Sequence, residues 1–157
     1  MSEKIIFVSH CILNQSIRKE KFSKIKELVG LFTESGVGIV QLPCPKIECN
    51  GRFIRNENNA KICKNYCKKT SSFIVNTIKK YLDANFKVLG ILGVEFSPIC
   101  GVYRINNGRK NIPGRGILIK GIENEMQKRN FQVPIISTNL NNVFSTLEKL
   151  DLLLKNS

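Results

Sequence analysis

The chain has 157 residues, 42% of them hydrophobic and 24% charged, and its 25 basic against 12 acidic residues give a net charge of +13. This length and composition predict one globular domain over 1–157 that needs no disulfide to fold. No apolar run reaches the ~18 residues of a membrane span. The start "MSEKIIFVSHC" lacks the basic region and long apolar core of a signal peptide, so we expect a cytoplasmic protein with no membrane partner.

The basic surplus would attract phosphate groups and steer anionic partners toward the protein. Lysines make up most of it, and they are spread from Lys4 to Lys155 rather than gathered in one stripe. This spread is also what a general compositional bias would produce. The charge therefore leaves RNA open as a partner and does not lead us to expect DNA.

The first half of the chain alternates short apolar runs with helical periodicity. A strand is predicted at 4–9, followed by a helix over 19–36 whose apolar residues recur every three or four positions and which ends at a glycine. A second strand is predicted at 37–43. The longest helix is predicted over 60–84.

The second half continues the same alternation. The run "KVLGILGV" at 87–94 predicts a strand buried on both faces, as a central parallel strand would be. A glycine-rich basic loop at 105–116 precedes a helix over 116–130, then a strand at 133–138 and a closing helix over 141–155. The pattern predicts α/β architecture with a mainly parallel sheet of about four or five strands flanked by helices.

Three cysteines follow three of the predicted strands. Cys11 comes after the first strand, Cys44 after the second, and Cys100 after the third. Because the carboxyl ends of parallel strands meet at one edge of the sheet, where ligands bind in open α/β folds, we expect the three thiols to converge.

Three convergent thiols have two interpretations. A structural zinc normally takes four ligands, whereas three cysteines leave one coordination position open, which suits an iron–sulfur cluster. Alternatively, they are small buried apolar residues, because free cysteine is among the most buried residue types. Position alone leaves both interpretations open.

The segments around these cysteines resemble a known family. "VSHCILN" at 8–14, "QLPCP" at 41–45 and "GVEFSPICG" at 93–101 are similar, in order and separation, to motifs of the 2-thiouracil desulfurase (desulfidase) family, formerly a domain of unknown function. The resemblance covers about residues 4–138. It implies a Rossmann-like domain in which Cys11, Cys44 and Cys100 are the metal ligands of a 4Fe-4S cluster, and in which an iron without a protein ligand takes sulfur from a thiolated pyrimidine.

The chain departs from the family at two positions. The residue after C-P is typically a glutamate that assists catalysis and is Lys46 here, and the second serine of S-P-S-C is Ile99. The first serine is kept as Ser97, a candidate to position the pyrimidine or relay a proton, or simply to begin a turn. Lys46, Glu48 and Glu95 are the other candidate catalytic residues.

Several of these candidates also have structural interpretations. Glu95 could equally pair with Arg104 or cap a loop, and Lys46 could be a solvent-exposed lysine. Arg52, Arg55 and Arg104 are candidates for binding the substrate, because a guanidinium suits planar bidentate contacts. The loop at 105–116 is a candidate anion-binding turn at a helix N-terminus.

The remaining cysteines are expected to be reduced, since disulfides are rare in the cytoplasm. Cys63 and Cys67 lie four residues apart on the apolar stripe of a helix and are expected to pack in the core. Cys49 is expected to pack or be exposed, with a role as spare ligand or sulfur acceptor as the alternative.

Three functions follow from these residues. The leading one is a cluster-dependent desulfidase acting on a thiolated pyrimidine, either free or as thiouridine in transfer RNA. The alternative is an RNA- or nucleotide-binding α/β module that has lost turnover. A third is a redox or sulfur-carrying protein that uses Cys44 and Cys49 as a thiol pair.

Overall fold

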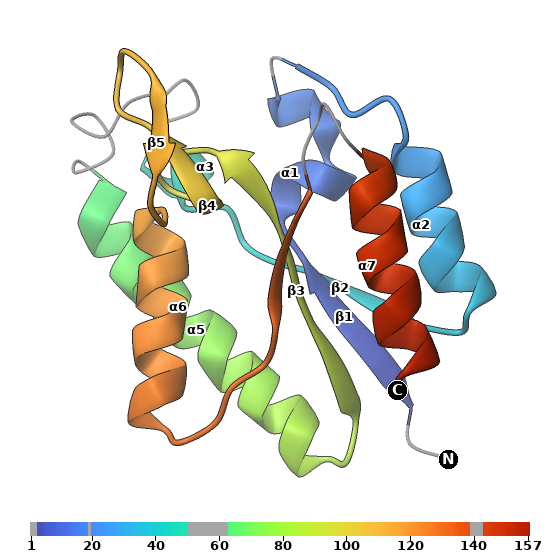
Figure 1. Ribbon diagram of the computed structural model, residues 1–157. Coiled ribbons are helices and arrows are strands. Elements are labelled where there is room, and N and C mark those ends of the chain that lie inside the picture. Colours follow the sequence, from blue (N-terminus) through green and yellow to red (C-terminus); the bar gives the residue numbers. More distant parts are fainter. Residues whose placement is uncertain (1–2, 19, 50–62, 139–142) are drawn as a thin grey trace.

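One sheet runs through the middle of the protein, whose computed structural model describes residues 3–18, 20–49, 63–138 and 143–157 (Figure 1). Within these residues six strands form the sheet in the order β2-β1-β3-β4-β5, and β6 also pairs with β3. All pairings are parallel except that of β4 with β5. The strands are β1 (Lys4–Val8), β2 (Gly38–Gln41), β3 (Lys87–Phe96), β4 (Gly101–Asn106), β5 (Asn111–Pro113) and β6 (Ile135–Thr138).

The alternation of side chains along β1 places it between two hydrophobic layers. Ile5 and Phe7 face one core cluster, and Ile6 and Val8 face the other. Since β2 pairs on one side of β1 and β3 on the other, the chain reverses its direction of travel across the sheet between β1 and β3. In this class of fold, ligands bind beside such a reversal, at the carboxyl ends of the strands.

Helices cover both faces of the sheet. In Figure 1, α5 and α6 lie against one face and α2 and α7 against the other, with α1 and α3 near the carboxyl ends of the strands. No helix in the described ranges is long and apolar enough to cross a membrane. The helices are α1 (His10–Leu13), α2 (Ile25–Glu34), α3 (Pro45–Glu48), α5 (Lys64–Asp83), α6 (Ile117–Lys128) and α7 (Val143–Lys155), with a 3-10 helix, η1, at Gln15–Ile17.

A glycine and a serine set the close approach of α5 to α6. A Cβ atom on Gly121 would lie 3.0 Å from the Cβ of Ser71 and would collide with its hydroxyl. The hydroxyl of Ser71 donates to the carbonyl of Cys67 at 2.7 Å and is 3.3 Å from that of Leu118. The contact is therefore close and polar in the middle, with apolar side chains around it.

The predicted fold class is confirmed: the structure is α/β, with a mostly parallel sheet flanked by helices, and the described sheet has six strands where about four or five were predicted. Two local predictions were wrong. The helix predicted over 19–36 begins only at Ile25, because Phe22 enters the core from the non-helical segment before it. The loop predicted at 105–116 contains the end of β4 and all of β5, which form an antiparallel hairpin.

Candidate functional site

The three cysteines predicted to converge lie at the carboxyl edge of the sheet. Cys11 is in α1 directly after β1, Cys44 is the residue before α3, and Cys100 ends the turn that follows β3. All three are free thiols and half-buried. Because their strands are adjacent in the order β2-β1-β3, Cys11 and Cys100 follow the two neighbouring strands β1 and β3, and Cys44 follows β2 on the other side of β1.

The electrostatics of these thiols place them in one neighbourhood. Burial raises the pKa of Cys44, backbone N–H groups of Ile47 and Lys46 lower it, and charge on the Cys11 sulfur raises it again. Burial raises the pKa of Cys100 well above its usual range, the Lys46 ammonium opposes this shift, and charge on Cys11 or Cys44 adds to it. Proximity of three thiols therefore disfavours ionising all of them without a compensating positive charge.

A serine-capped turn holds Cys100. The Ser97 hydroxyl oxygen accepts from the backbone N–H groups of Ile99 at 3.2 Å and Cys100 at 3.0 Å. The carbonyl of Ser97 accepts from the N–H of Gly101 at 2.7 Å. The structure thus gives Ser97 the turn-capping role, while its hydroxyl hydrogen is not used in either bond and can still be donated.

The same turn receives the N-terminus of α6. The N–H groups of Ile117 and Leu118 donate to the carbonyls of Pro98 and Ile99, at 3.2 and 2.9 Å, and Gly116 N–H donates to Gly101 at 2.8 Å. These amides are the ones an anion at the helix terminus would need. The anion-binding turn predicted before this helix is therefore not formed by them, because the turn that carries Cys100 already uses them.

Glu95 is held by backbone amides. One carboxylate oxygen accepts from the N–H of Tyr103 and the other from the N–H of Arg104, each at 2.9 Å. The guanidinium of Arg104 donates instead to the carbonyl of Asn111 across the hairpin, at 3.2 Å. These bonds favour the structural interpretation of Glu95, which joins the end of β3 to β4, and they tie Arg104 to the hairpin.

Lys46 and Glu48 both lie on α3, with different surroundings. Lys46 is half-buried, and its ammonium acts on the thiols of Cys44 and Cys100. Glu48 is exposed. Of these two candidates, Lys46 is the one that shares the electrostatic neighbourhood of the cysteines.

One residue at this edge, Arg18, was not predicted from the sequence as part of the site. The guanidinium of Arg18 donates a hydrogen bond to the sulfur of Cys11 at 3.2 Å. Cys67 on α5 is a buried free thiol, as predicted for a packing residue, and burial together with charge on Cys44 raises its pKa to about 11. No sequence pattern predicted the contact of Arg18 with Cys11, because Arg18 is extended after η1 and reaches Cys11 only through the way the segment after α1 folds.

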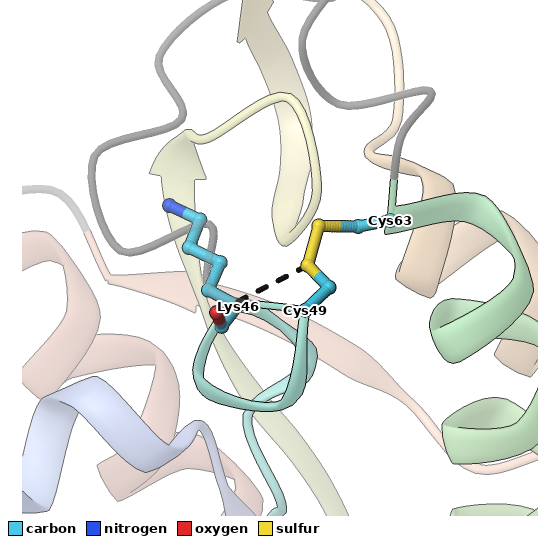
Figure 2. The surroundings of a disulfide bond; sticks show 3 residues. All are labelled: Lys46, Cys49 and Cys63. Atoms are coloured by element: carbon cyan, nitrogen blue, oxygen red, sulfur yellow. Dashed lines mark hydrogen bonds between the residues drawn. A yellow bond between two sulfur atoms is a disulfide. The ribbon is translucent and has the colours of Figure 1, made fainter.

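The structure corrects the expectation that all six cysteines are reduced. Cys49 and Cys63 form a disulfide between the end of α3 and the start of α5, with Cα atoms 5.7 Å apart (Figure 2). The predicted thiol pair of Cys44 with Cys49 is not formed, because these residues flank opposite ends of α3. Figure 2 shows the Lys46 side chain extending away from the disulfide.

We expect reduction of this disulfide to lower the free energy of unfolding of the protein by about 3 kcal/mol, because the bond closes a loop between residues separated by 14 in the sequence. Urea unfolding with and without a dithiol reductant measures the change. Cys67→Ala is the matched control and should keep the cross-link in a non-reducing peptide map. If Cys49 is alkylated before reduction as fast as Cys44 is, the disulfide is not present and the expected loss of stability is contradicted.

Two further predictions lie outside what the structure tests. Arg52 and Arg55 lie outside the described residues. Among the residues that are described, no group of three or more His, Cys, Asp or Glu side chains is arranged to hold a metal ion. The assignment of Cys11, Cys44 and Cys100 as metal ligands therefore stays a prediction.

The sheet order and the thiols at its carboxyl edge define a Rossmann-like α/β protein with a cysteine-rich candidate site. No family model matches the chain. It is 28% identical over 162 residues to the uncharacterized protein MJ0003 of Methanocaldococcus jannaschii, a match that covers 94% of this chain and 97% of that protein.

One solved structure is similar along nearly the whole chain. It is the [4Fe-4S]-dependent thiouracil desulfidase TudS, with a TM-score of 0.53 and 20% identity over 96% of this chain and 99% of that one. At this identity the similarity shows a shared fold. The resemblance that the three cysteine motifs indicated is thus supported at the level of fold.

Proposed function

We propose that this protein is an iron–sulfur-dependent desulfidase that converts a thiolated pyrimidine to its oxo form. Water supplies the oxygen, and the sulfur leaves as hydrogen sulfide. The observation that carries the proposal is that three free, half-buried thiols, Cys11, Cys44 and Cys100, follow the three neighbouring strands β1, β2 and β3 at one edge of the sheet. The similarity of fold to a thiouracil desulfidase supports it.

The donor set fits an iron–sulfur cluster chemically. Thiolates are the usual ligands of such clusters, and a 4Fe-4S cluster with three cysteines leaves one iron free for a thiophilic contact with the substrate. Cys11, Cys44 and Cys100 would hold such a cluster, and within the described residues no group of side chains is arranged around a single metal ion.

The protein's own residues would bind and orient the substrate beside these thiols. The Lys46 ammonium already acts on Cys44 and Cys100, so it can neutralise negative charge that develops as sulfur departs. The hydroxyl of Ser97 keeps a hydrogen to donate to the pyrimidine while its oxygen holds the Cys100 turn. Neither role needs a carboxylate at position 46.

A second candidate function is an RNA- or nucleotide-binding module that keeps the scaffold without turnover. Two observations favour it: Lys46 stands where the desulfidase motif has glutamate, and both oxygens of Glu95 are held by backbone amides. The net charge of +13 suits an RNA that contains thiouridine, and such binding would weaken steeply with salt. The cytoplasm is the compartment in which we place either function.

Oxygen-free reconstitution with iron and sulfide tests both candidates. We expect a brown protein that contains iron and acid-labile sulfide and that releases sulfide from one of thiouracil, thiouridine or thiouridine-containing transfer RNA. A protein that stays colourless and iron-free would contradict the desulfidase. A loaded protein that binds the RNA but releases no sulfide from any of the three would favour the binding module.

A further inference from the structure

We propose that Arg18 is a positioning residue that sets the electron density on the Cys11 sulfur, and with it the reduction potential of a cluster bound there. The inference rests on the proposed function, since it concerns the group that Cys11 would hold. Its starting point is the hydrogen bond from an Nη1–H of Arg18 to the Cys11 Sγ, 3.2 Å long and partly buried.

The guanidinium is fixed on three sides. Besides Nη1 on the sulfur, its Nε–H donates to the carbonyl of Glu20 at 3.0 Å, and its central carbon lies 4.4 Å from the centre of the Phe22 ring. Phe22 is itself buried, with 5% of its surface exposed. A planar cation stacked on a buried ring and bound at two edges can hold one N–H group steadily on a sulfur atom.

The local chain also fixes Arg18. It follows the 3-10 helix η1, and its backbone N–H donates to the carbonyl of Gln15 at 3.0 Å. The side-chain oxygen of Gln15 accepts from the N–H of Phe22. The ammonium of Lys21 donates to the carbonyls of Gln15 and Arg18 at 2.8 and 3.1 Å. These hydrogen bonds hold the chain around Arg18 in a conformation in which the guanidinium reaches Cys11.

A hydrogen bond to a ligand sulfur has a defined chemical effect. It draws electron density away from the sulfur and stabilises the more negative, reduced state of the bound cluster, which raises its reduction potential. The positive charge of the guanidinium acts in the same direction. Arg18 is therefore expected to make the cluster easier to reduce than the same three cysteines would alone.

The test compares midpoint potentials from redox titrations followed by electron paramagnetic resonance. Arg18→Met keeps an unbranched apolar stem over Phe22 but removes the donors and the charge. We expect its midpoint to shift to more negative values. Arg18→Lys keeps the charge but lacks the planar guanidinium, so its midpoint potential should lie between those of Arg18→Met and the wild-type protein.

Arg129→Lys is the matched control, because Arg129 lies at the opposite end of α6 from the Cys100 turn and contacts Asn76 and Glu125. If both Arg18 variants hold the wild-type amount of iron and neither midpoint moves further than that of the control, the proposal is overturned. Wild-type protein that takes up no cluster would instead overturn the proposed function on which it rests. Iron content measured on each sample separates these two outcomes.

Discussion

Serine at position 100 is expected to remove most of the iron and acid-labile sulfide from the protein reconstituted without oxygen. Serine is nearly the same size as cysteine, so the turn held by Ser97 should survive. Its hydroxyl oxygen, however, is a harder and far less acidic ligand than a thiol, and iron–sulfur clusters select thiolates. Cys11→Ser and Cys44→Ser should give the same loss, because each leaves the site with two thiolates.

The fourth free thiol at this edge supplies the control for those variants. Cys67 is close enough for charge on Cys44 to affect its pKa, but it lies on α5, has none of its surface exposed and packs in a hydrophobic core cluster, whereas Cys11, Cys44 and Cys100 are half-buried beyond the strand ends. We therefore expect Cys67→Ala to keep the full iron content. Equal losses in Cys67→Ala and Cys100→Ser would mean that the cluster ligands are assigned wrongly.

Much of this site could be predicted because it depends on the order of the strands. Periodicity located β1 and β3, and the rule that parallel strands end at one edge then placed Cys11 and Cys100, from distant parts of the sequence, at the same edge of the sheet. The rule needs no knowledge of individual contacts. It is sufficient for side chains that directly follow a strand.

Side chains further from the strands could not be predicted in this way. The disulfide joins Cys49 to Cys63 only because α3 packs near the start of α5. Neither the spacing of the cysteines nor the periodicity of the helices predicts that packing. The contact of Arg18 with Cys11 likewise depends on how the segment after α1 folds back. A structural role for Glu95 was among the predictions, but its partners were not: it receives backbone N–H groups from β4, a strand not predicted at all.

Alanine at position 116 is expected to destabilise the protein by about 3 kcal/mol, at the upper end of what overpacking costs. A Cβ atom there would lie 2.2 Å from the carbonyl oxygen of Ile99 and 2.7 Å from the backbone nitrogen of Cys100. Neither atom belongs to a side chain that can rotate away. The φ of Gly116 is −63°, a value that alanine adopts freely, so the loss would come from collision and not from backbone strain.

The Gly116→Ala substitution should also displace residues of the candidate site. Relieving the collision requires moving the turn away from α6, which would break the bonds from Ile117 and Leu118 to Pro98 and Ile99 and displace Cys100. Urea unfolding gives the loss of stability, and iron analysis after reconstitution gives the effect on the site. Gly30→Ala in α2 is the matched control: its Cβ would meet no atom within 4 Å, and we expect a gain of about 0.5–1 kcal/mol from the lower backbone entropy of alanine. Gly116→Ala protein as stable as the wild type, with full iron content, would show that the Cys100 turn is not fixed against α6.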